Sequence, residues 1–200
     1  IKTTYGEAYN GVLKTASALS ARLSGAIYNS VVGIYMENSL EWIECFWAVI
    51  ACGFRPLLLN LRLDDGTLNQ ALADCKAFAV ISDGKQFSVP TIKANELANG
   101  ADGFKPDKFG TEILLMSSGT SSHVKVCAYS AEELYYQVLD SYEIIKECKA
   151  MKTHYKGHLK LLTFLPFYHV FGLIAVYMWF AFLSRTSVQL NDMAPPPTLR

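Results

Sequence analysis

The sequence has no Cys-x-x-Cys pair, no run of like charges and no excess of either charge sign. Its five cysteines are odd in number and scattered, which argues against a disulfide framework and against a zinc site. We therefore expect reduced, mostly buried thiols in a cytoplasmic protein. Acidic and basic residues balance at 18 each, so no nucleic-acid partner is expected.

The sequence also lacks a charged-then-apolar leader pattern at its start. One apolar run, residues 161–183, has the length of a membrane-spanning helix. Pro166 interrupts this run, and a proline at that position breaks a helix. We interpret the run as a buried strand over 160–165, a turn and a buried helix over 170–183. A membrane span is the less favoured alternative.

Short apolar runs alternate with amphipathic stretches along the chain, which predicts strands that alternate with helices. Asn38 and either Asp64 or Asp65 are the expected N-caps of two of the helices. The pattern predicts an α/β fold with a mostly parallel sheet covered by helices on both faces. The expected strands cover 31–36, 54–60, 78–82, 87–92, 111–116, 124–129, 159–165 and 187–190, and the expected helices 7–23, 39–52, 65–76, 131–149 and 170–183. A polar connection over 93–110 is expected on the surface.

A serine-rich stretch, MSSGTSSHVK, follows the strand predicted over 111–116. Ligands of open α/β sheets bind outside the carboxyl ends of strands. Gly119 lets backbone N–H groups converge, and Lys125 supplies a cation. Hydroxyl donors come from Ser117, Ser118, Thr120, Ser121 and Ser122. These groups can surround a phosphate. The alternative is a serine-rich turn without a ligand, and the P-loop of nucleoside triphosphatases is excluded because no Gly-Lys-Ser/Thr follows.

A second stretch, LPFYHVFG at residues 165–172, places His169 between a predicted strand and an apolar helix. A lone histidine in such a position is more often a hydrogen-bonded core residue than a catalyst. The functional alternative is a histidine at the wall of an apolar pocket, where its neutral ring orients a substrate carboxylate.

These stretches together resemble the N-terminal part of the adenylate-forming (AMP-binding) enzymes, which include acyl- and aryl-CoA synthetases, luciferases and peptide-synthetase adenylation domains. The family's phosphate loop, T-S-G-T-T-G-x-P-K-G, corresponds to residues 117–126, and its L-P-x-x-H-x-x-G stands intact at 165–172. Residues 33–42 and 51–60 resemble two earlier segments, V-A-I-x-x-x-N-S-x-E and A-G-x-x-x-x-P-L-N. An unrelated doubly wound domain would need four ordered matches by chance.

The resemblance implies a ligase reaction in two steps. A carboxylate attacks the α-phosphate of ATP, giving an acyl-adenylate and pyrophosphate, and a thiol, usually coenzyme A, then takes the acyl group. The resemblance assigns the β- and γ-phosphates of ATP, with magnesium, to residues 117–122 and Lys125. Thr120 is the implied magnesium contact, through the phosphates. His169 carries over as the catalytic-site residue at the wall of the acyl pocket.

The loop departs from the family pattern at three positions. Ser122 replaces the second glycine, Val124 the proline and Val126 the last glycine. Serine disfavours a positive φ that glycine adopts freely, and the two valines make the second arm resemble an ordinary strand. The alternative function is therefore a non-catalytic, degenerate binding or scaffold relative with an impaired phosphate loop.

The family's adenine-binding G-Y-G-x-T-E motif, its ribose-binding aspartate and its C-terminal lysine have no counterpart up to Arg200. We expect residues 1–192 to form an incomplete N-terminal domain, and residues 193–200 to be a proline-rich end that is disordered or marks a boundary. The chain alone is expected to be inactive without the downstream part of the same enzyme. The expected substrate is a small carboxylic acid, fatty or aryl rather than an amino acid, because no aspartate is evident to meet an amine.

Overall fold

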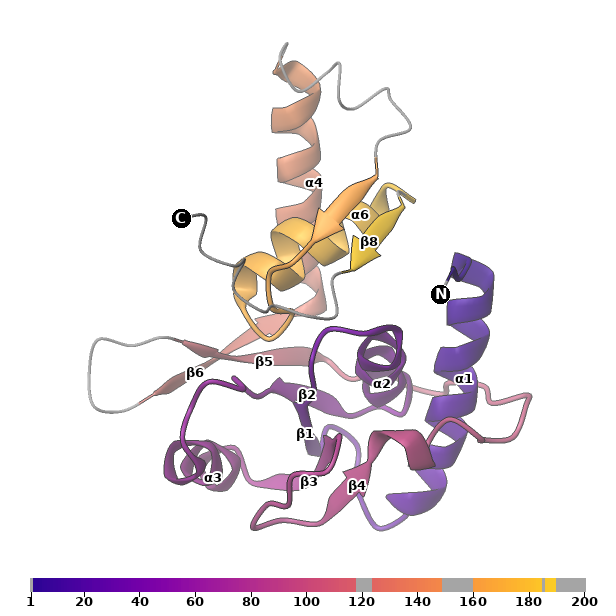
Figure 1. The fold of residues 1–200 in the computed structure, drawn as a ribbon, viewed down its shortest axis with the longest axis vertical. Helices are drawn as coiled ribbons and strands as arrows, with labels where there is room; N and C mark the ends of the chain where they lie inside the picture. Colours follow the sequence, from indigo (N-terminus) through magenta and orange to yellow (C-terminus); the bar gives the residue numbers. More distant parts are fainter. Residues whose placement is uncertain (1, 118–123, 149–159, 185, 190–200) are drawn as a thin grey trace, which may run out of the picture. The chain divides into compact units, whose positions relative to one another are not determined.

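The structure is a computed structural model that describes residues 2–117, 124–148, 160–184 and 186–189. The chain divides into two compact units, residues 1–131 and 132–200, and each is described by itself (Figure 1). The boundary expected near residue 192 lies outside the described residues and stays a prediction.

The first unit is built on a six-stranded sheet in the order β4-β3-β1-β2-β5-β6. Every neighbouring pair is parallel except the last, because β6 runs antiparallel to β5. The central strands are nearly continuous apolar runs, which is typical of strands covered on both faces. The strands are β1 (Val31–Tyr35), β2 (Arg55–Leu58), β3 (Ala77–Ser82), β4 (Thr91–Lys93), β5 (Glu112–Ser117) and β6 (Lys125–Ser130). The mostly parallel sheet predicted from the sequence is confirmed.

Helices cover both faces of this sheet, as predicted. Alternate strand side chains point to opposite faces, and Leu57 and Leu114 join α3 in one core cluster. A separate cluster of Ala16, Ala48 and Ala51 holds α1 against α2. The helices are α1 (Tyr5–Arg22), α2 (Leu40–Ala51), α3 (Asp65–Asp74) and the short turn η1 (Ala94–Glu96). Figure 1 shows α1 and α2 as neighbours, with α3 apart from them.

Two helices begin at residues other than the expected ones. The cap of α2 is Ser39 and not Asn38, because the Ser39 hydroxyl accepts the backbone N–H of Trp42 at 2.9 Å. Helix α1 begins before the expected residue 7, because Thr4 caps it and Glu7 is the third helical residue of a capping box. The alternative cap Asp64 of α3 is confirmed.

The second unit contains nearly all of helix α4 and a two-stranded parallel sheet. Phe182 lies against two rings of α4, with centroid distances of 6.5 Å to Tyr135 and 6.4 Å to Tyr142. The elements are α4 (Ala131–Glu147), β7 (Leu161–Thr163), η2 (Phe171–Met178), α6 (Trp179–Phe182) and β8 (Ser187–Gln189). None of the helices in the described parts of the chain is long and apolar enough to cross a membrane.

Several predicted elements differ from the structure, among them the strand expected over 159–165, of which only Leu161–Thr163 is a strand within the described residues. The helix expected over 170–183 is a π-helical turn, η2, followed by α6. A stretch that is apolar on every side carries no periodic signal that separates the two helix types. The strand expected over 87–92 is shorter and begins later, as β4. The Phe87 N–H donates to the Thr91 hydroxyl, and the chain bends between these two residues. The connection over 93–110 is not wholly on the surface, since Leu97 is buried.

The cysteines are free, as predicted, but they are not mostly buried. Cys45 alone is buried, Cys52 and Cys75 are half-buried, and Cys127 and Cys148 are exposed. Cys127 is exposed because it lies on β6, the outermost strand of the described sheet. Composition alone does not reveal which strand lies at an edge.

Candidate functional site

The serine-rich loop starts at the carboxyl end of a core strand. Residues 113–116 of β5 are buried and apolar, and β5 ends at the half-buried Ser117. β6 then returns antiparallel, with Ser117 paired to Lys125 and Met116 paired to Val126. The loop is therefore held at both ends by a strand pair that belongs to the main sheet.

Only two of the predicted phosphate-binding residues fall within the described part of the chain. Ser117 and Lys125 face each other across the mouth of the β5–β6 hairpin. Lys125 is exposed, and no ion pair among the described residues includes it. An exposed cation and a hydroxyl at the mouth are groups that fit an anion. The other predicted contacts, Ser118, Gly119, Thr120, Ser121 and Ser122, lie outside the described residues.

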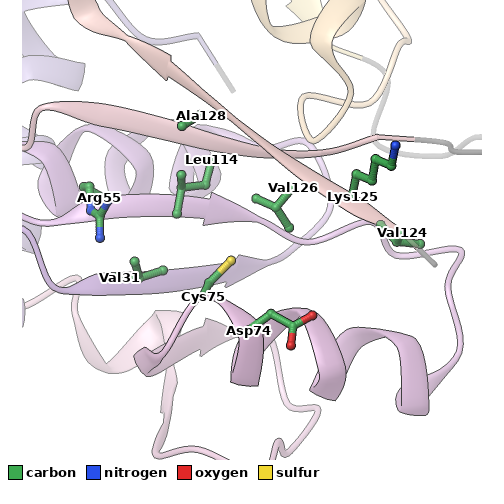
Figure 2. A pocket seen from close by; sticks show the side chains of 9 residues that line it. All are labelled: Val31, Arg55, Asp74, Cys75, Leu114, Val124, Lys125, Val126 and Ala128. Carbon is green, nitrogen blue, oxygen red and sulfur yellow. The ribbon is translucent and has the colours of Figure 1, made fainter.

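A pocket of about 630 Å³ lies beside this hairpin, on the face of the sheet that α3 covers. We call it the α3 groove. It lies between the carboxyl end of α3 and the strands β5 and β6 (Figure 2). Lys125 extends away from the apolar side chains in this view. The lining residues are Val31, Arg55, Asp74, Cys75, Leu114, Val124, Lys125, Val126 and Ala128. The sequence analysis missed this pocket, although apolar residues at alternate positions of an outer strand, 124, 126 and 128, were its signal.

Arg55 closes one end of the α3 groove and is already satisfied by its neighbours. Its Nη1 donates to Glu112 Oε2 at 2.8 Å, and its Nε donates to the Asn29 carbonyl at 2.9 Å. Beside it, burial raises the pKa of the Cys75 thiol, the Asp74 carboxylate raises it further, and Arg55 opposes both effects. Cys75 is therefore a neutral thiol and a poor nucleophile at neutral pH.

His169 lies in a tight turn that its own motif builds. The backbone N–H of His169 donates to the Pro166 carbonyl at 3.1 Å, and the N–H of Phe171 donates to His169 Nδ1 at 3.3 Å. A Cβ on Gly172 would lie 2.1 Å from the Pro166 carbonyl oxygen, so only glycine fits there. Phe167 is fully buried beneath the turn. The motif thus fixes a local fold as well as presenting a histidine.

The interpretation of His169 as a core residue is wrong. Its side chain is exposed, and within the described residues its ring accepts a hydrogen bond from the Phe171 N–H alone. Nδ1 is the ring atom that accepts this hydrogen bond. The loop after β5 and His169 belong to different units of the chain. Their joint role in one site therefore stays a prediction.

Three carboxyl groups, on Glu41, Glu44 and Asp83, were not singled out from the sequence. Burial raises the pKa of all three carboxyl groups. The negative charge of Asp83 raises the pKa of Glu41 further, and the negative charge of Glu41 raises the pKa of Glu44 further. Across the described ranges of the chain, no group of three or more His, Cys, Asp or Glu side chains could hold a metal ion. The raised pKa values of these carboxyl groups bear on the pH dependence of stability.

Comparison with known proteins places the whole chain in one family. The family model described as AMP-binding enzyme matches residues 1–198. Among curated proteins, the 2-succinylbenzoate–CoA ligase of Geobacillus sp. (strain WCH70) is 37% identical over 82 residues, which are 41% of this chain and 16% of that protein. The nonribosomal peptide synthetase acyN of Ascocoryne sarcoides is 24% identical over 145 residues, which cover 62% of this chain and 16% of that protein.

Solved structures share the fold. The o-succinylbenzoate CoA synthetase (MenE) of Bacillus subtilis, in complex with its acyl-adenylate intermediate, has a TM-score of 0.80 at 19% identity. The match covers 96% of this chain and 50% of that one. The N-terminal domain of FACL13 from Mycobacterium tuberculosis has a TM-score of 0.78 at 20% identity, with 96% and 51% covered. The chain therefore spans about half the length of these solved neighbours.

Proposed function

Because the chain belongs to the AMP-binding enzyme family, we propose that it is part of an ATP-dependent ligase that converts a small carboxylic acid to its acyl-adenylate. The acyl group then passes to coenzyme A or to another thiol. The five free cysteines support a reducing, cytoplasmic setting for this reaction.

One observation carries this proposal. A hydroxyl-rich loop leaves the carboxyl end of the buried strand β5 and returns at Lys125, which lies opposite Ser117 in the hairpin. The carboxyl end of a parallel strand is where open α/β sheets bind ligands. The loop therefore starts in the right place on the sheet to hold the β- and γ-phosphates of ATP.

The chemistry that this end of the hairpin supplies is electrostatic. Negative charge develops on the pyrophosphate oxygens as they leave the α-phosphate, so a nearby cation and hydroxyl donors stabilise the transition state more than the ground state. Lys125 and Ser117 are the described groups that fit this role. Magnesium, where bound, would be held mainly by the phosphates and by Thr120, as the family resemblance implies.

His169 is proposed to orient the substrate carboxylate. Its side chain is exposed at the turn before η2, and its Nδ1 is held by the Phe171 N–H. With Nδ1 acting as an acceptor, the neutral ring carries its proton on Nε2. That N–H is the group that would donate to a carboxylate oxygen.

The substrate class is proposed from chemistry and from relatives. The named relatives are ligases for 2-succinylbenzoate and a peptide synthetase. These names do not support the expectation that the substrate is a fatty acid. We therefore favour an aryl or other small carboxylic acid as the substrate. Coenzyme A as acceptor fits the relative that is named a CoA ligase.

A second candidate function rests on the second arm of the loop. β6 is a regular strand from Lys125 onward, and Val126 pairs with Met116 in an ordinary ladder. A family member whose loop no longer closes around phosphate would act as a binding or scaffold protein. This alternative predicts a folded chain without measurable affinity for MgATP.

ATP–pyrophosphate exchange tests the proposed function. The 200-residue chain is expected to show no exchange with a panel of carboxylic acids, including 2-succinylbenzoate, benzoate and octanoate. A longer protein that includes the downstream part of the gene is expected to exchange with at least one of them. Robust exchange by the 200-residue chain would refute the predicted inactivity, and no exchange or MgATP binding by the longer protein would favour the scaffold function.

A further inference from the structure

Strand β5 leads into the phosphate loop, yet its parallel ladder with the core of the sheet is short. Along β2, its register partners are Leu114 opposite Leu57 and Leu115 opposite Leu58, in the middle of a six-residue strand. Residues 113–116 are all apolar and buried, so a slip by one residue would exchange one apolar side chain for another. The hydrophobic pattern therefore specifies the register of β5 only weakly.

An ion pair at the amino end of β5 selects one register. Arg55 and Glu112 stand two positions before Leu57 and Leu114, so they continue the same pairing on the same face. Arg55 Nη1 donates to Glu112 Oε2 at 2.8 Å. A slip by one residue would turn the carboxylate to the opposite face, and a slip by two would move it about 7 Å along the strand. The observed register is the one that joins these two charges.

Asn29, in the turn before β1, ties the same two strands together. Its carbonyl accepts a hydrogen bond from Arg55 Nε at 2.9 Å, and its Oδ1 accepts the Thr111 N–H at 3.2 Å. Its own N–H donates to the Gly53 carbonyl at 2.8 Å. Asn29 has a φ of 63°, a left-handed conformation in which asparagine is enriched. One residue thus holds both the Arg55 side chain and the backbone that enters β5.

We propose that Asn29, Arg55 and Glu112, which we call the β5 clamp, are positioning residues for the phosphate site. The clamp fixes β5 at one end, and the other end presents Ser117 opposite Lys125. Because β6 pairs with β5 along its whole length, the hairpin shifts as one piece. The inference rests on the proposed function, since it states how the same site is held in place.

The geometry gives the clamp a catalytic consequence. A slip of β5 by one residue would carry Ser117 and Lys125 about 3.3 Å along the sheet. A misplacement of about 1 Å can already cost on the order of 100-fold in rate. A partly exposed ion pair contributes little to the free energy of unfolding. Loss of the clamp should therefore loosen β5 and weaken ATP use far more than it lowers global stability.

A second ion pair supplies a matched control. Arg22 Nη1 lies 2.7 Å from Glu96 Oε2, and the two side chains are 47% and 40% exposed, against 30% and 36% for Arg55 and Glu112. This pair joins α1 to η1 and involves neither β2 nor β5. Arg22→Met and Arg55→Met each keep an apolar stem and remove the guanidinium.

Hydrogen exchange in the native full-length protein reads the register contacts without any use of ATP. We expect amides of residues 112–117 to exchange about tenfold faster in Arg55→Met, and the β1 amides of residues 31–35 to keep the parent rate. Asn29→Gly should act in the same way, because glycine adopts the left-handed φ freely and keeps the carbonyl but loses Oδ1. Arg22→Met should leave both segments unchanged.

MgATP affinity reads the positioning role in the same protein. Calorimetry should show a Kd for MgATP raised about fivefold or more in Arg55→Met, and pyrophosphate exchange should show a similar rise in KM for ATP. The KM for the carboxylic acid should stay within about twofold of the parent value. Arg55→Lys, which keeps a cation beside Glu112, and Asn29→Asp, which keeps an oxygen acceptor for the Thr111 N–H, should recover most of the affinity.

The possible results separate the clamp from the proposed reaction. Unchanged exchange of residues 112–117 in Arg55→Met would overturn the register contact. Faster exchange with an unchanged Kd for MgATP would make the clamp merely structural and overturn the positioning role. A parent protein that binds MgATP but exchanges no pyrophosphate would refute the proposed ligase reaction alone, and the Kd would still decide the clamp. A parent that binds no MgATP would overturn both.

Discussion

Ser117 and Lys125 are register partners across the antiparallel pair β5–β6. Eight positions separate them in the sequence, yet the hairpin brings their backbones side by side at the carboxyl end of a buried strand. This arrangement places a hydroxyl and an unpaired cation at the two ends of the loop that the family resemblance assigns to phosphate. Among the described residues, no ion pair competes for the lysine.

Replacement of Lys125 by alanine should weaken the use of ATP in the longer protein. The ammonium group is expected to stabilise charge that develops on the leaving pyrophosphate, so kcat/KM for ATP should fall by about 10- to 100-fold, as for loss of one electrostatic contact. Pyrophosphate exchange measures the change. Lys93→Ala, at an exposed position of β4, is the control and should be silent. Equal behaviour of the two variants would remove Lys125 from the site.

Replacement of His169 by alanine should lower activity without lowering stability. The imidazole is exposed and its one described hydrogen bond is to a neighbouring N–H, so the folded state loses little. We expect KM for the carboxylic acid to rise in the longer protein while the melting temperature changes by no more than about 2 °C, the scale of a surface substitution. A large loss of melting temperature would instead assign His169 a structural role.

Replacement of Gly172 by alanine should destabilise the chain. The added Cβ would lie 2.1 Å from the Pro166 carbonyl oxygen, which is a backbone atom that does not rotate away. A cost of about 1–3 kcal/mol is expected for such overpacking. Gly6→Ala is the matched control, because its Cβ would have free space in the first turn of α1. Thermal denaturation of the 200-residue chain distinguishes the two, and a silent Gly172→Ala would contradict the close contact.

Replacement of Ser39 by alanine should cost about 1 kcal/mol, because the Ser39 hydroxyl is the cap that accepts the Trp42 N–H. Ser39→Thr retains the acceptor and should retain most of the stability. Urea denaturation at pH 7 measures both variants. If Ser39→Ala and Ser39→Thr were equally stable, the cap of α2 would lie elsewhere.

The titration of Glu44 should contribute to the pH dependence of the free energy of unfolding. Burial and the charge of Glu41 raise the pKa of the Glu44 carboxyl above its ordinary value, so the folded state holds the proton more tightly than the unfolded state. This contribution to stability is present at low pH and is lost as the pH rises from the ordinary carboxyl pKa through the raised one. Glu44→Gln should therefore be more stable than the parent at pH 7, with less difference at pH 4.

Lys85 gives a control for this experiment, because its contribution to stability has the same sign but a different pH window. Its hydrogen bond to Asp65 raises the pKa of the ammonium group, so the folded state favours the charged form up to a higher pH. Its contribution is lost only in the alkaline range and does not overlap that of Glu44. Urea denaturation between pH 4 and pH 8 should show a flatter profile for Glu44→Gln than for the parent, and parallel profiles would contradict the assignment.

Most elements of the fold could be predicted because their signal is local. The apolar run 31–36 and the periodic stretch 65–76 contain their own strand and helix patterns, and both elements form nearly as expected. The regular strand at β6 follows from Val124 and Val126, the residues that replace a proline and a glycine of the family loop. Caps were less predictable, because Asn38 and Ser39 are adjacent and both are good caps.

The sequence by itself determined the order of strands and helices and the position of the serine-rich loop after β5, because periodicity and turn residues act over a few positions. Tertiary structure decided what distant segments do to one another. It set β1 between β2 and β3, joined Arg55 to Glu112, and left the α3 groove beside β6. These features depend on which elements pack together, and no stretch of neighbouring residues contains that information.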